Sequence, residues 1–139
     1  MQYAALKFAI SEDVNEDGDT RIILSRDIFE NMLKMALKGA NLLDESYYIR
    51  KYPDVAQAIS KGLIANAEQH YYNTGYYENR LPRNIIVDEA YYLKENPDVA
   101  AAVKRGTVKT AQEHFEMAGF GEGRLPYRGF SFFTTYSNK

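Results

Sequence analysis

Residues 44–82 read DESYYIRKYPDVAQAISKGLIANAEQHYYNTGYYENRLP, and residues 88–126 read DEAYYLKENPDVAAAVKRGTVKTAQEHFEMAGFGEGRLP. The second stretch follows the first at a constant offset of 44 residues without a gap, and 17 of the 39 aligned positions are identical. A match of this length at one fixed period indicates an internal structural repeat. Two copies are fewer than the ~3 that a stacked array needs, so we expect the flanking residues 1–43 and 127–139 to complete the core.

Each copy contains the start and stop signals of three short helices. An N-cap aspartate opens a first helix, which must end before a proline because the residue preceding proline avoids the helical conformation. The proline suits the first position of a second helix, and a glycine in the left-handed conformation suits its end. A further polar cap opens the third helix, which ends near another glycine. These signals are Asp44 and Asp88, Pro53 and Pro97, Gly62 and Gly106, Asn66 and Thr110, and Gly75 and Gly119.

The N-terminal flank predicts a hairpin followed by a helix. Tyr3–Ile10 and Arg21–Leu24 read as two short strands joined by a turn-rich acidic loop. Ser25 suits the N-cap of a helix over residues 26–38, whose broad apolar surface predicts a central place in the core.

The C-terminal tail, residues 127–139, holds five aromatic residues. We predict that Phe130 and Phe132 form a third strand, buried against the hairpin and the helix, while Phe133 stays exposed for a homodimer contact. The predicted fold class is mainly α, within α+β: two three-helix repeats plus a small antiparallel sheet of two or three strands, formed by the N-terminal hairpin with or without the C-terminal strand. The predicted divisions are residues 1–43, 44–82, 88–126 and 127–139.

The composition excludes several classes of protein. The chain has no cysteine, which removes disulfides, thiolate metal sites and cysteine nucleophiles. Lys plus Arg number 17 and Asp plus Glu number 19, so a net charge of −2 gives no attraction to nucleic acid or an anionic membrane. No stretch approaches the ~20 apolar residues of a spanning helix, so we expect no membrane insertion. Without a basic leader we expect a cytoplasmic location, although secretion through a C-terminal signal would escape this reasoning.

The sequences YYLKENPDVAAAVKRG and EHFEMAGFGEGRLP resemble a short bacterial repeat module of the general form W/YYLxxNPDVAxAV…G…A..H(Y/F)…G..EGR.P. The resemblance covers both copies of 39 residues, 78 of the 139 residues in all. Such modules occur in tandem beside glycosyltransferases and in large bacterial surface or secreted proteins. The resemblance implies a helical accessory or interaction unit in polysaccharide or envelope biology, and it carries over no catalytic residue.

The acidic loop matches the first half of a calcium-binding loop. Asp13, Asn15 and Asp17 place oxygen ligands at positions 1, 3 and 5, a glycine follows at position 6, and Asp19 adds a carboxylate. Position 12 is Leu24, where such a loop needs a bidentate glutamate. We therefore expect a solvated hairpin loop and no cofactor, with calcium bound by these residues as the alternative.

Two pairs of polar residues recur at equivalent positions. His70 and His114, the only histidines, could face one shared site, but two ligands are fewer than the three that a zinc site usually has. We favour a half-buried imidazole that is hydrogen-bonded within its own copy. Arg80 and Arg124 could contact an anion or an acidic sugar through the guanidinium fork. We favour pairing of each arginine with an acid or with carbonyls of its own copy.

Tyrosines are the best candidates for a binding surface. Adjacent tyrosines on a helix point about 100° apart, so one of each pair can pack while the other faces outward. Outward tyrosines are typical of protein interfaces and can stack on sugars. The predicted binding residues are Tyr47, Tyr48, Tyr72, Tyr76 and Tyr77, together with Arg80 and Arg124.

These patterns predict a non-catalytic bacterial interaction or adaptor module linked to polysaccharide or envelope biology. Its expected partner is another protein or a second copy of the chain. One alternative is a carbohydrate-binding module that binds a glycan with exposed tyrosines, and another is a small enzyme with a shared His70 and His114 site. No catalytic residue is assigned, since the sequence lacks a Gly-rich phosphate loop, a GxSxG elbow and an HExxH motif.

Overall fold

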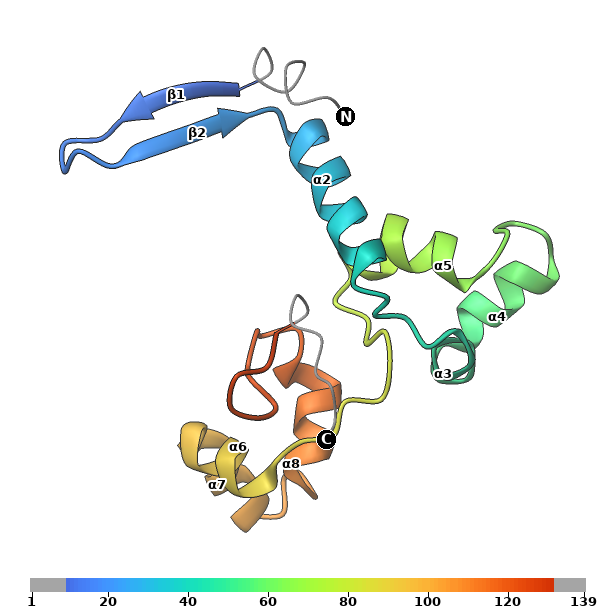
Figure 1. The fold of residues 1–139 in the computed structure, drawn as a ribbon. Coiled ribbons are helices and arrows are strands. Elements are labelled where there is room, and N and C mark those ends of the chain that lie inside the picture. Colours follow the sequence, from blue (N-terminus) through green and yellow to red (C-terminus); the bar gives the residue numbers. More distant parts are fainter. Residues whose placement is uncertain (1–9, 132–139) are drawn as a thin grey trace. The chain divides into compact units, whose positions relative to one another are not determined.

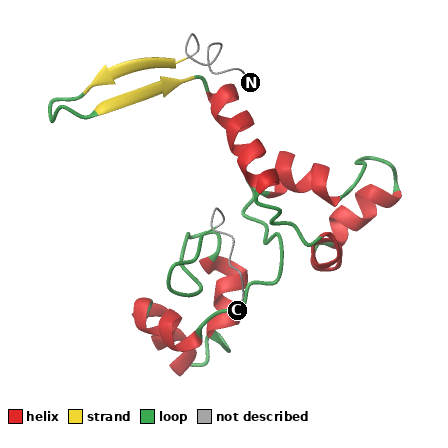
Figure 2. Cartoon of the chain, in the orientation of Figure 1, coloured by secondary structure: helices red, strands yellow, loops and turns green. Residues whose placement is uncertain are grey.

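The computed structural model describes residues 10–131 and divides the chain into two units, residues 1–39 and residues 40–139. The fold is mainly helical with one small antiparallel sheet, as predicted (Figures 1 and 2). The described elements are β1 (Ile10–Val14), β2 (Thr20–Leu24), α2 (Arg26–Gly39), α3 (Glu45–Lys51), α4 (Pro53–Ser60), α5 (Ala67–His70), η1 (Tyr71–Gly75), α6 (Glu89–Glu95), α7 (Pro97–Lys104), α8 (Ala111–His114) and η2 (Phe115–Gly119). The segments η1 and η2 are π-helical turns that continue α5 and α8.

The hairpin of unit 1 has a shorter turn than the sequence predicts. β1 pairs antiparallel with β2, and Val14 lies opposite Thr20. Asn15 closes the turn twice, because its amide donates to the Asp19 carbonyl and its Oδ1 accepts from the Asp19 amide at 2.7 Å. Residues 11–14, which include the acidic Glu12 and Asp13, therefore belong to a strand rather than to the loop, since an exposed strand tolerates charged side chains.

The prediction that α2 is central to the core is wrong. Ser25 stands at its start, where its Oγ accepts from the Ile28 amide at 3.4 Å. Leu37 is the one buried side chain of the helix, whereas Phe29 and Met32 are exposed. The physical reason is that the described residues of unit 1, 10–39, offer the helix a two-stranded sheet, which is too small to bury a 14-residue helix.

The first two helices of each repeat begin at the predicted residues. The side chain of Asp44 accepts from the Tyr47 amide at 2.9 Å, and that of Asp88 accepts from the Tyr91 amide at 3.0 Å. The second helices, α4 and α7, have their prolines in the first turn, where a missing N–H leaves no hydrogen bond unmade. The structure confirms these N-terminal signals.

The remaining boundaries of the repeats also follow the sequence. Gly62 and Gly106 have φ values of 69° and 74°, the left-handed conformation that ends α4 and α7. Asn66 and Thr110 cap the third helices by accepting from the amides of Gln69 and Glu113. The sequence predicts these boundaries because each depends on a residue type with one strong local preference.

Each repeat closes on itself through one backbone hydrogen bond. The amide of Asp44 donates to the Pro82 carbonyl at 3.0 Å, and the amide of Asp88 donates to the Pro126 carbonyl at 2.9 Å. The first N-cap of a repeat is therefore joined to its last residue. Four equivalent positions form the centre of each repeat, and all are fully buried: Tyr48, Val55, Ala67 and Tyr71 in the first, and Tyr92, Val99, Ala111 and Phe115 in the second.

The prediction of a third strand at Phe130 is wrong. The Phe130 amide donates to the Tyr127 carbonyl in a turn, and the two rings meet edge to face with centroids 5.4 Å apart. Both rings pack against the core of the second repeat. They lie there because the chain stays beside the second repeat after Pro126, where an apolar surface is within reach. The predictions for Phe132 and Phe133 lie outside the described residues.

Candidate functional site: an aromatic cleft between two closing turns

A tyrosine, a histidine and a glycine meet at the same place in each repeat. The hydroxyl of Tyr48 lies 3.0 Å from Nδ1 of His70, and the two share a hydrogen bond. A side chain on Gly75 would collide with that hydroxyl, so the glycine makes room for the pair. Burial lowers the pKa of His70, and the positive charge of Arg80 adds to this effect.

The second repeat contains the same arrangement. The hydroxyl of Tyr92 lies 3.0 Å from Nδ1 of His114, and Gly119 leaves the space that the hydroxyl occupies. Each imidazole is thus bound to a tyrosine of its own repeat. This arrangement favours the local role of the histidines over a site that the two would share.

After its π-helical turn each repeat ends in a closing turn, residues 76–82 in the first repeat and 120–126 in the second. The arginines of the two closing turns form equivalent ion pairs. Arg80 contacts Asp54 at 2.8 Å and Glu78 at 2.7 Å, and its guanidinium lies over the Tyr52 ring. The Asp54 carboxylate stands in the first turn of α4. Arg80 therefore joins the closing turn of the first repeat to the start of its second helix, and its charge is neutralised there.

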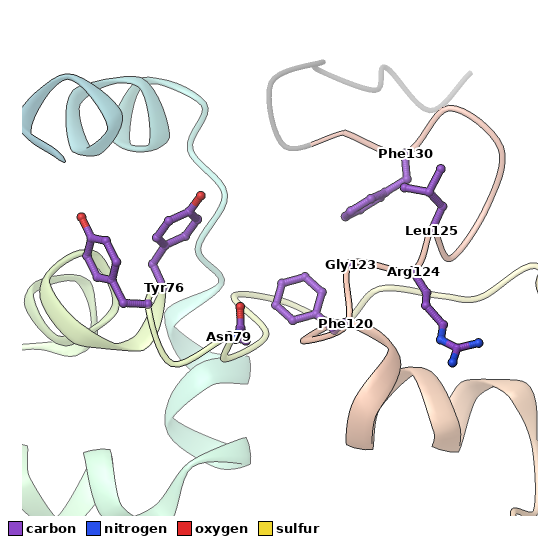
Figure 3. A pocket seen from close by; sticks show the side chains of 8 residues that line it. Tyr76, Asn79, Phe120, Gly123, Arg124, Leu125 and Phe130 are labelled. Carbon is purple, nitrogen blue, oxygen red and sulfur yellow. The ribbon is translucent and has the colours of Figure 1, made fainter. Parts of the chain in front are cut away.

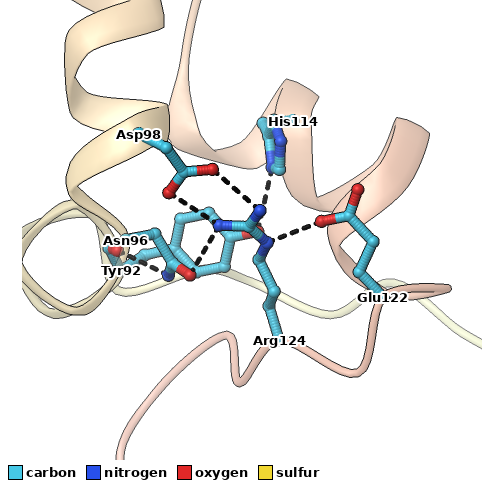
Figure 4. Close-up of polar contacts among 6 residues, drawn as sticks. All are labelled: Tyr92, Asn96, Asp98, His114, Glu122 and Arg124. Atoms are coloured by element: carbon cyan, nitrogen blue, oxygen red, sulfur yellow. Dashed lines mark hydrogen bonds and ion pairs between the residues drawn. The ribbon is translucent and has the colours of Figure 1, made fainter.

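Arg124 repeats this pattern with more contacts (Figure 4). Its Nη1 and Nη2 donate to the two carboxylate oxygens of Asp98, its Nε donates to Glu122, and Nη1 also donates to Asn96. These hydrogen bonds lower the pKa of Asp98 to about 2. Both arginines are occupied by acids of their own repeat, so neither presents an uncompensated charge to a ligand.

The two closing turns line an open cleft of about 390 Å³ (Figure 3). Tyr76 of the first repeat and Phe120 of the second occupy equivalent positions, and so do Asn79 and Gly123. The cleft is thus built twice from the same part of the repeat. Its lining consists of Tyr76, Tyr77, Asn79, Phe120, Gly123, Arg124, Leu125 and Phe130.

Packing on the repeat cores holds the rings of the cleft in place. Tyr76 meets the buried Tyr71 edge to face at 6.3 Å, and Phe120 meets the buried Phe115 in the same way at 5.9 Å. Tyr77 packs edge to face on Tyr76 with ring centroids 5.4 Å apart. The aromatic lining is therefore an extension of the two cores to the surface.

Left-handed backbone shapes both turns next to the cleft. Asn79 has a φ of 56°, and its amide donates to the Tyr76 carbonyl at 3.1 Å. Gly123 has a φ of 72°, and its amide donates to the Phe120 carbonyl at 3.1 Å. Asparagine is one of the few residues with a side chain that adopts this conformation readily. At this position the first repeat therefore places a polar side chain in the cleft, where the second repeat has none.

The chemistry of the lining is that of a binding site for a largely apolar group. Arg124 contributes its stem, because its guanidinium points away from the rings and toward its acidic partners (Figures 3 and 4). The polar atoms of the lining side chains are otherwise the hydroxyls of Tyr76 and Tyr77 and the amide of Asn79. None of the lining residues is a carboxylate, an imidazole or a lysine, three of the side chains that transfer protons in enzymes.

The predicted binding residues fall into separate places. Tyr76, Tyr77 and Arg124 line the cleft, whereas Tyr48 and Tyr72 are buried. This burial corrects the prediction for Tyr48 and Tyr72. The Tyr48 hydroxyl is hydrogen-bonded to His70, and the Tyr72 ring packs against the ring of Tyr71.

Tyr47 lies at the contact between the repeats. It packs against the core of the second repeat and carries the ammonium of Lys51 over its ring at 5.8 Å. Lys51 in turn pairs with Glu116 of the second repeat at 2.6 Å. The remaining predicted residue, Arg80, belongs to the ion pairs of the first repeat.

Sequence reasoning missed three apolar members of the cleft, Phe120, Leu125 and Phe130. One signal for Phe120 was present, since it occupies the position that Tyr76 has in the first copy. No such signal marked Leu125, because its equivalent Leu81 is buried in the core of the second repeat.

The acidic turn of unit 1 does not gather its side chains around one point. Within residues 10–131, no group of three or more His, Cys, Asp or Glu side chains is placed to hold a metal ion. The Oδ1 atom of Asn15 is used to close the turn. The predicted calcium ligands Asp13, Asp17 and Asp19 lie on and beside this turn.

Comparisons with family models, with curated proteins and with solved structures give no match to this chain. The resemblance of the two repeats to the bacterial module therefore stays a prediction. In the part of the chain that the structure describes, every helix is too short or too polar to cross a membrane.

Proposed function

We propose that this chain is a non-catalytic binding module whose aromatic cleft takes an apolar or aromatic side chain of a partner protein. The observation that carries the proposal is the composition of the cleft. Its lining is mostly aromatic and aliphatic, and its one charged residue, Arg124, is neutralised by Asp98 and Glu122.

The dimensions of the cleft suit this role. A volume of about 390 Å³ is at the small end of the ~300–1,000 Å³ range of ligand pockets, and one or two side chains would fill it. Protein interfaces obtain much of their affinity from a few aromatic or aliphatic anchors in such pockets. Leu125 and Tyr77 are each more than 40% exposed, so an incoming side chain would remove apolar surface from water.

The envelope or polysaccharide setting is part of the proposal and rests on the resemblance of the repeats to the bacterial module. An adaptor in that setting needs a surface for its partner and no reactive group. Two repeats that each fix their own histidine and arginine meet this description, because those polar residues are used to hold the fold.

A sugar ring is the second candidate for the ligand. Tyr76 and Tyr77 offer ring faces with hydroxyls, and Asn79 adds an amide beside them. Sugars bind to aromatic faces while their hydroxyls take hydrogen bonds from such groups. A glycan would place its apolar face on the rings and its edge toward Asn79.

The test offers ligands of both classes to the full chain. Binders are selected from a random peptide library and from a glycan array, and the Kd of each is then measured by calorimetry. Tyr77→Ala and Phe120→Ala should each weaken a cleft ligand about 30-fold, the usual cost of losing an aromatic anchor. The matched control is Leu63→Ala, because Leu63 is an exposed apolar residue that does not line the cleft.

The outcomes separate the two candidates. Peptides that depend on Tyr77 and Phe120 support the proposal. Glycans with the same dependence, in the absence of such peptides, replace it by the second candidate. If no ligand of either class responds to the two variants while their thermal unfolding stays cooperative, the cleft is not a binding site and the proposal fails.

A further inference from the structure

The last residues that the structure describes bring the chain to the aromatic cleft of unit 2. Phe130 lines this cleft, and Ser131 is the final described residue (Figure 3). The segment that follows, residues 132–139, reads FFTTYSNK and begins with two further phenylalanines. An apolar stretch of the same chain therefore starts at the edge of the cleft.

The start of this segment is anchored to the second repeat. The Phe130 amide donates to the Tyr127 carbonyl at 3.3 Å, and both rings pack against the core of that repeat. Two residues of chain span no more than about 7 Å, so the Cα atom of Phe132 stays within this distance of the Cα atom of Phe130. The first ring of the segment is therefore held within reach of the cleft by the covalent chain.

The segment and the lining of the cleft match in chemistry. Among residues 130–139 the one charged side chain is that of Lys139, nine residues after Phe130. The one charged side chain of the lining, that of Arg124, is neutralised by Asp98 and Glu122. An aromatic ring that enters the cleft would therefore leave water without breaking an ion pair, and burial of such a ring is favourable.

The spacing along the chain selects Phe132 over Phe133 as the ring that enters. Neighbouring side chains of an extended chain point to opposite sides, and side chains two residues apart point to the same side. Because Phe130 lines the cleft, an extended continuation places Phe132 on that side and Phe133 on the other. Tyr77 and Leu125 of the lining are each more than 40% exposed, so they offer apolar surface for this ring to cover.

We propose that Phe132 is an intramolecular ligand of the aromatic cleft and competes there with the side chain of a partner protein. The competition rests on the proposed function, since it has a consequence only if the cleft binds a partner. A ligand on a short tether has an effective concentration in the millimolar range, so it excludes weak binders and yields to tight ones. The segment would thus set the affinity that a partner needs.

The first test locates the Phe132 ring in the full natural chain by NMR. With isotope-labelled leucine methyl groups and phenylalanine rings, nuclear Overhauser effects should connect the Leu125 methyl groups to the Phe132 ring. Phe132→Leu should remove this signal, and the matched control Phe133→Leu should leave it in place. An equal mixture of labelled and unlabelled chains distinguishes a contact within one chain from a contact between two copies.

The second test measures the competition with a probe of known sequence, the peptide FSFFTTYSNK of residues 130–139. The full chain with Phe132→Ala should bind this peptide about tenfold more tightly than the natural chain, as expected when the tethered ring occupies the cleft about nine-tenths of the time. The full chain with Phe133→Ala should bind it as the natural chain does. Cooperative thermal unfolding verifies that both variants are folded.

The outcomes separate this inference from the proposed function. A Leu125–Phe132 contact within one chain, together with the tighter binding of the peptide, supports the inference. It is overturned if that contact is absent, if it forms between two copies, or if the peptide binds the natural chain and the Phe132→Ala chain equally. If the contact is present but no library peptide or glycan binds the Phe132→Ala chain, the proposed function fails, and with it the competition, whereas the contact of Phe132 with the cleft stands.

Discussion

Each repeat ends in an equivalent leucine, which is buried in the first repeat and exposed in the second. Leu81 is 2% exposed and lies in the core of the second repeat together with Ile85. Leu125, at the equivalent position, is 43% exposed and lines the cleft. The chain after Leu81 continues into another repeat, whereas the chain after Leu125 turns back through Tyr127 and Phe130. The interior of a repeat is therefore fixed locally, while the burial of its last leucine depends on the segment that comes next in the chain.

The largest expected difference is between these two leucines. Leu81→Ala removes a buried side chain and should lower the free energy of unfolding by about 3 kcal/mol. Leu125→Ala should cost less than about 1 kcal/mol, because much of its side chain already meets water. Urea unfolding of unit 2, followed by near-UV circular dichroism, measures both. Equal losses would mean that the two ends of the repeats are equivalent in solution.

The two glycines beside the tyrosine hydroxyls should behave alike. Gly75→Ala and Gly119→Ala insert a methyl group where the hydroxyls of Tyr48 and Tyr92 lie, so each should cost about 2 kcal/mol. Gly121→Ala is the matched control, since a side chain there would meet its neighbours at ordinary contact distances of 3.5 Å or more. The same unfolding experiment applies. A cost in one repeat but not in the other would break the equivalence of their interiors.

Among the four equivalent positions at the buried centre of each repeat, one carries different residues, Tyr71 in the first repeat and Phe115 in the second. The Tyr71 hydroxyl is buried without a hydrogen-bond partner, and Phe115 has no such group. Tyr71→Phe should therefore stabilise the chain by about 1 kcal/mol, and Phe115→Tyr should destabilise it by a similar amount. Paired denaturation midpoints test both signs. Destabilisation by Tyr71→Phe would show that the hydroxyl has a partner in solution.

The smallest expected effect is the response of the ion pairs to acid. Hydrogen bonds from Arg124 lower the pKa of Asp98 to about 2, and Arg80 lowers the pKa of Asp54. A carboxyl whose pKa is lower in the folded state stabilises the fold above its unfolded pKa of about 3.9 and loses this contribution as the pH falls toward 2. Arg124→Gln should therefore flatten the decline of the melting temperature between pH 4 and pH 2.

Arg80→Gln is the matched variant for this acid response. It should have the same direction of effect, because Asp54 stands at the position of Asp98. Both carboxylates are more than half exposed, so solvent screening keeps the changes small. Melting curves that decline with acid as steeply as those of the natural chain would contradict the role given to the arginines.

The boundaries of the repeats could be predicted because each depends on one residue. An aspartate N-cap, a proline in the first turn and a glycine with positive φ act within a few residues of their own position. The purpose of Gly75 could not be predicted in the same way. It depends on Tyr48, which is 27 positions away in sequence and reaches the glycine only after three helices have packed.

Two further features could not be predicted from the sequence, the cleft of unit 2 and the exposure of α2 in unit 1. Phe120 and Tyr76 could be matched through the repeat, but their meeting at one cleft depends on how the two closing turns lie within unit 2. The apolar face of α2 predicts a core surface because an amphipathic pattern looks the same whether its cover comes from the same unit or from another chain. The pattern predicts burial and does not name the partner.

The hydrogen bond from Asp44 to Pro82, and its counterpart from Asp88 to Pro126, brings the two ends of each repeat together. A segment whose ends meet can be copied or deleted in a gene without pulling the neighbouring segments apart. Each 44-residue period can in this sense be duplicated as a unit, and the gapless match of the two copies is the pattern that such a duplication produces. Longer and shorter forms of this chain are therefore accessible by insertion or loss of whole periods, each of which brings its own Tyr–His pair and its own arginine.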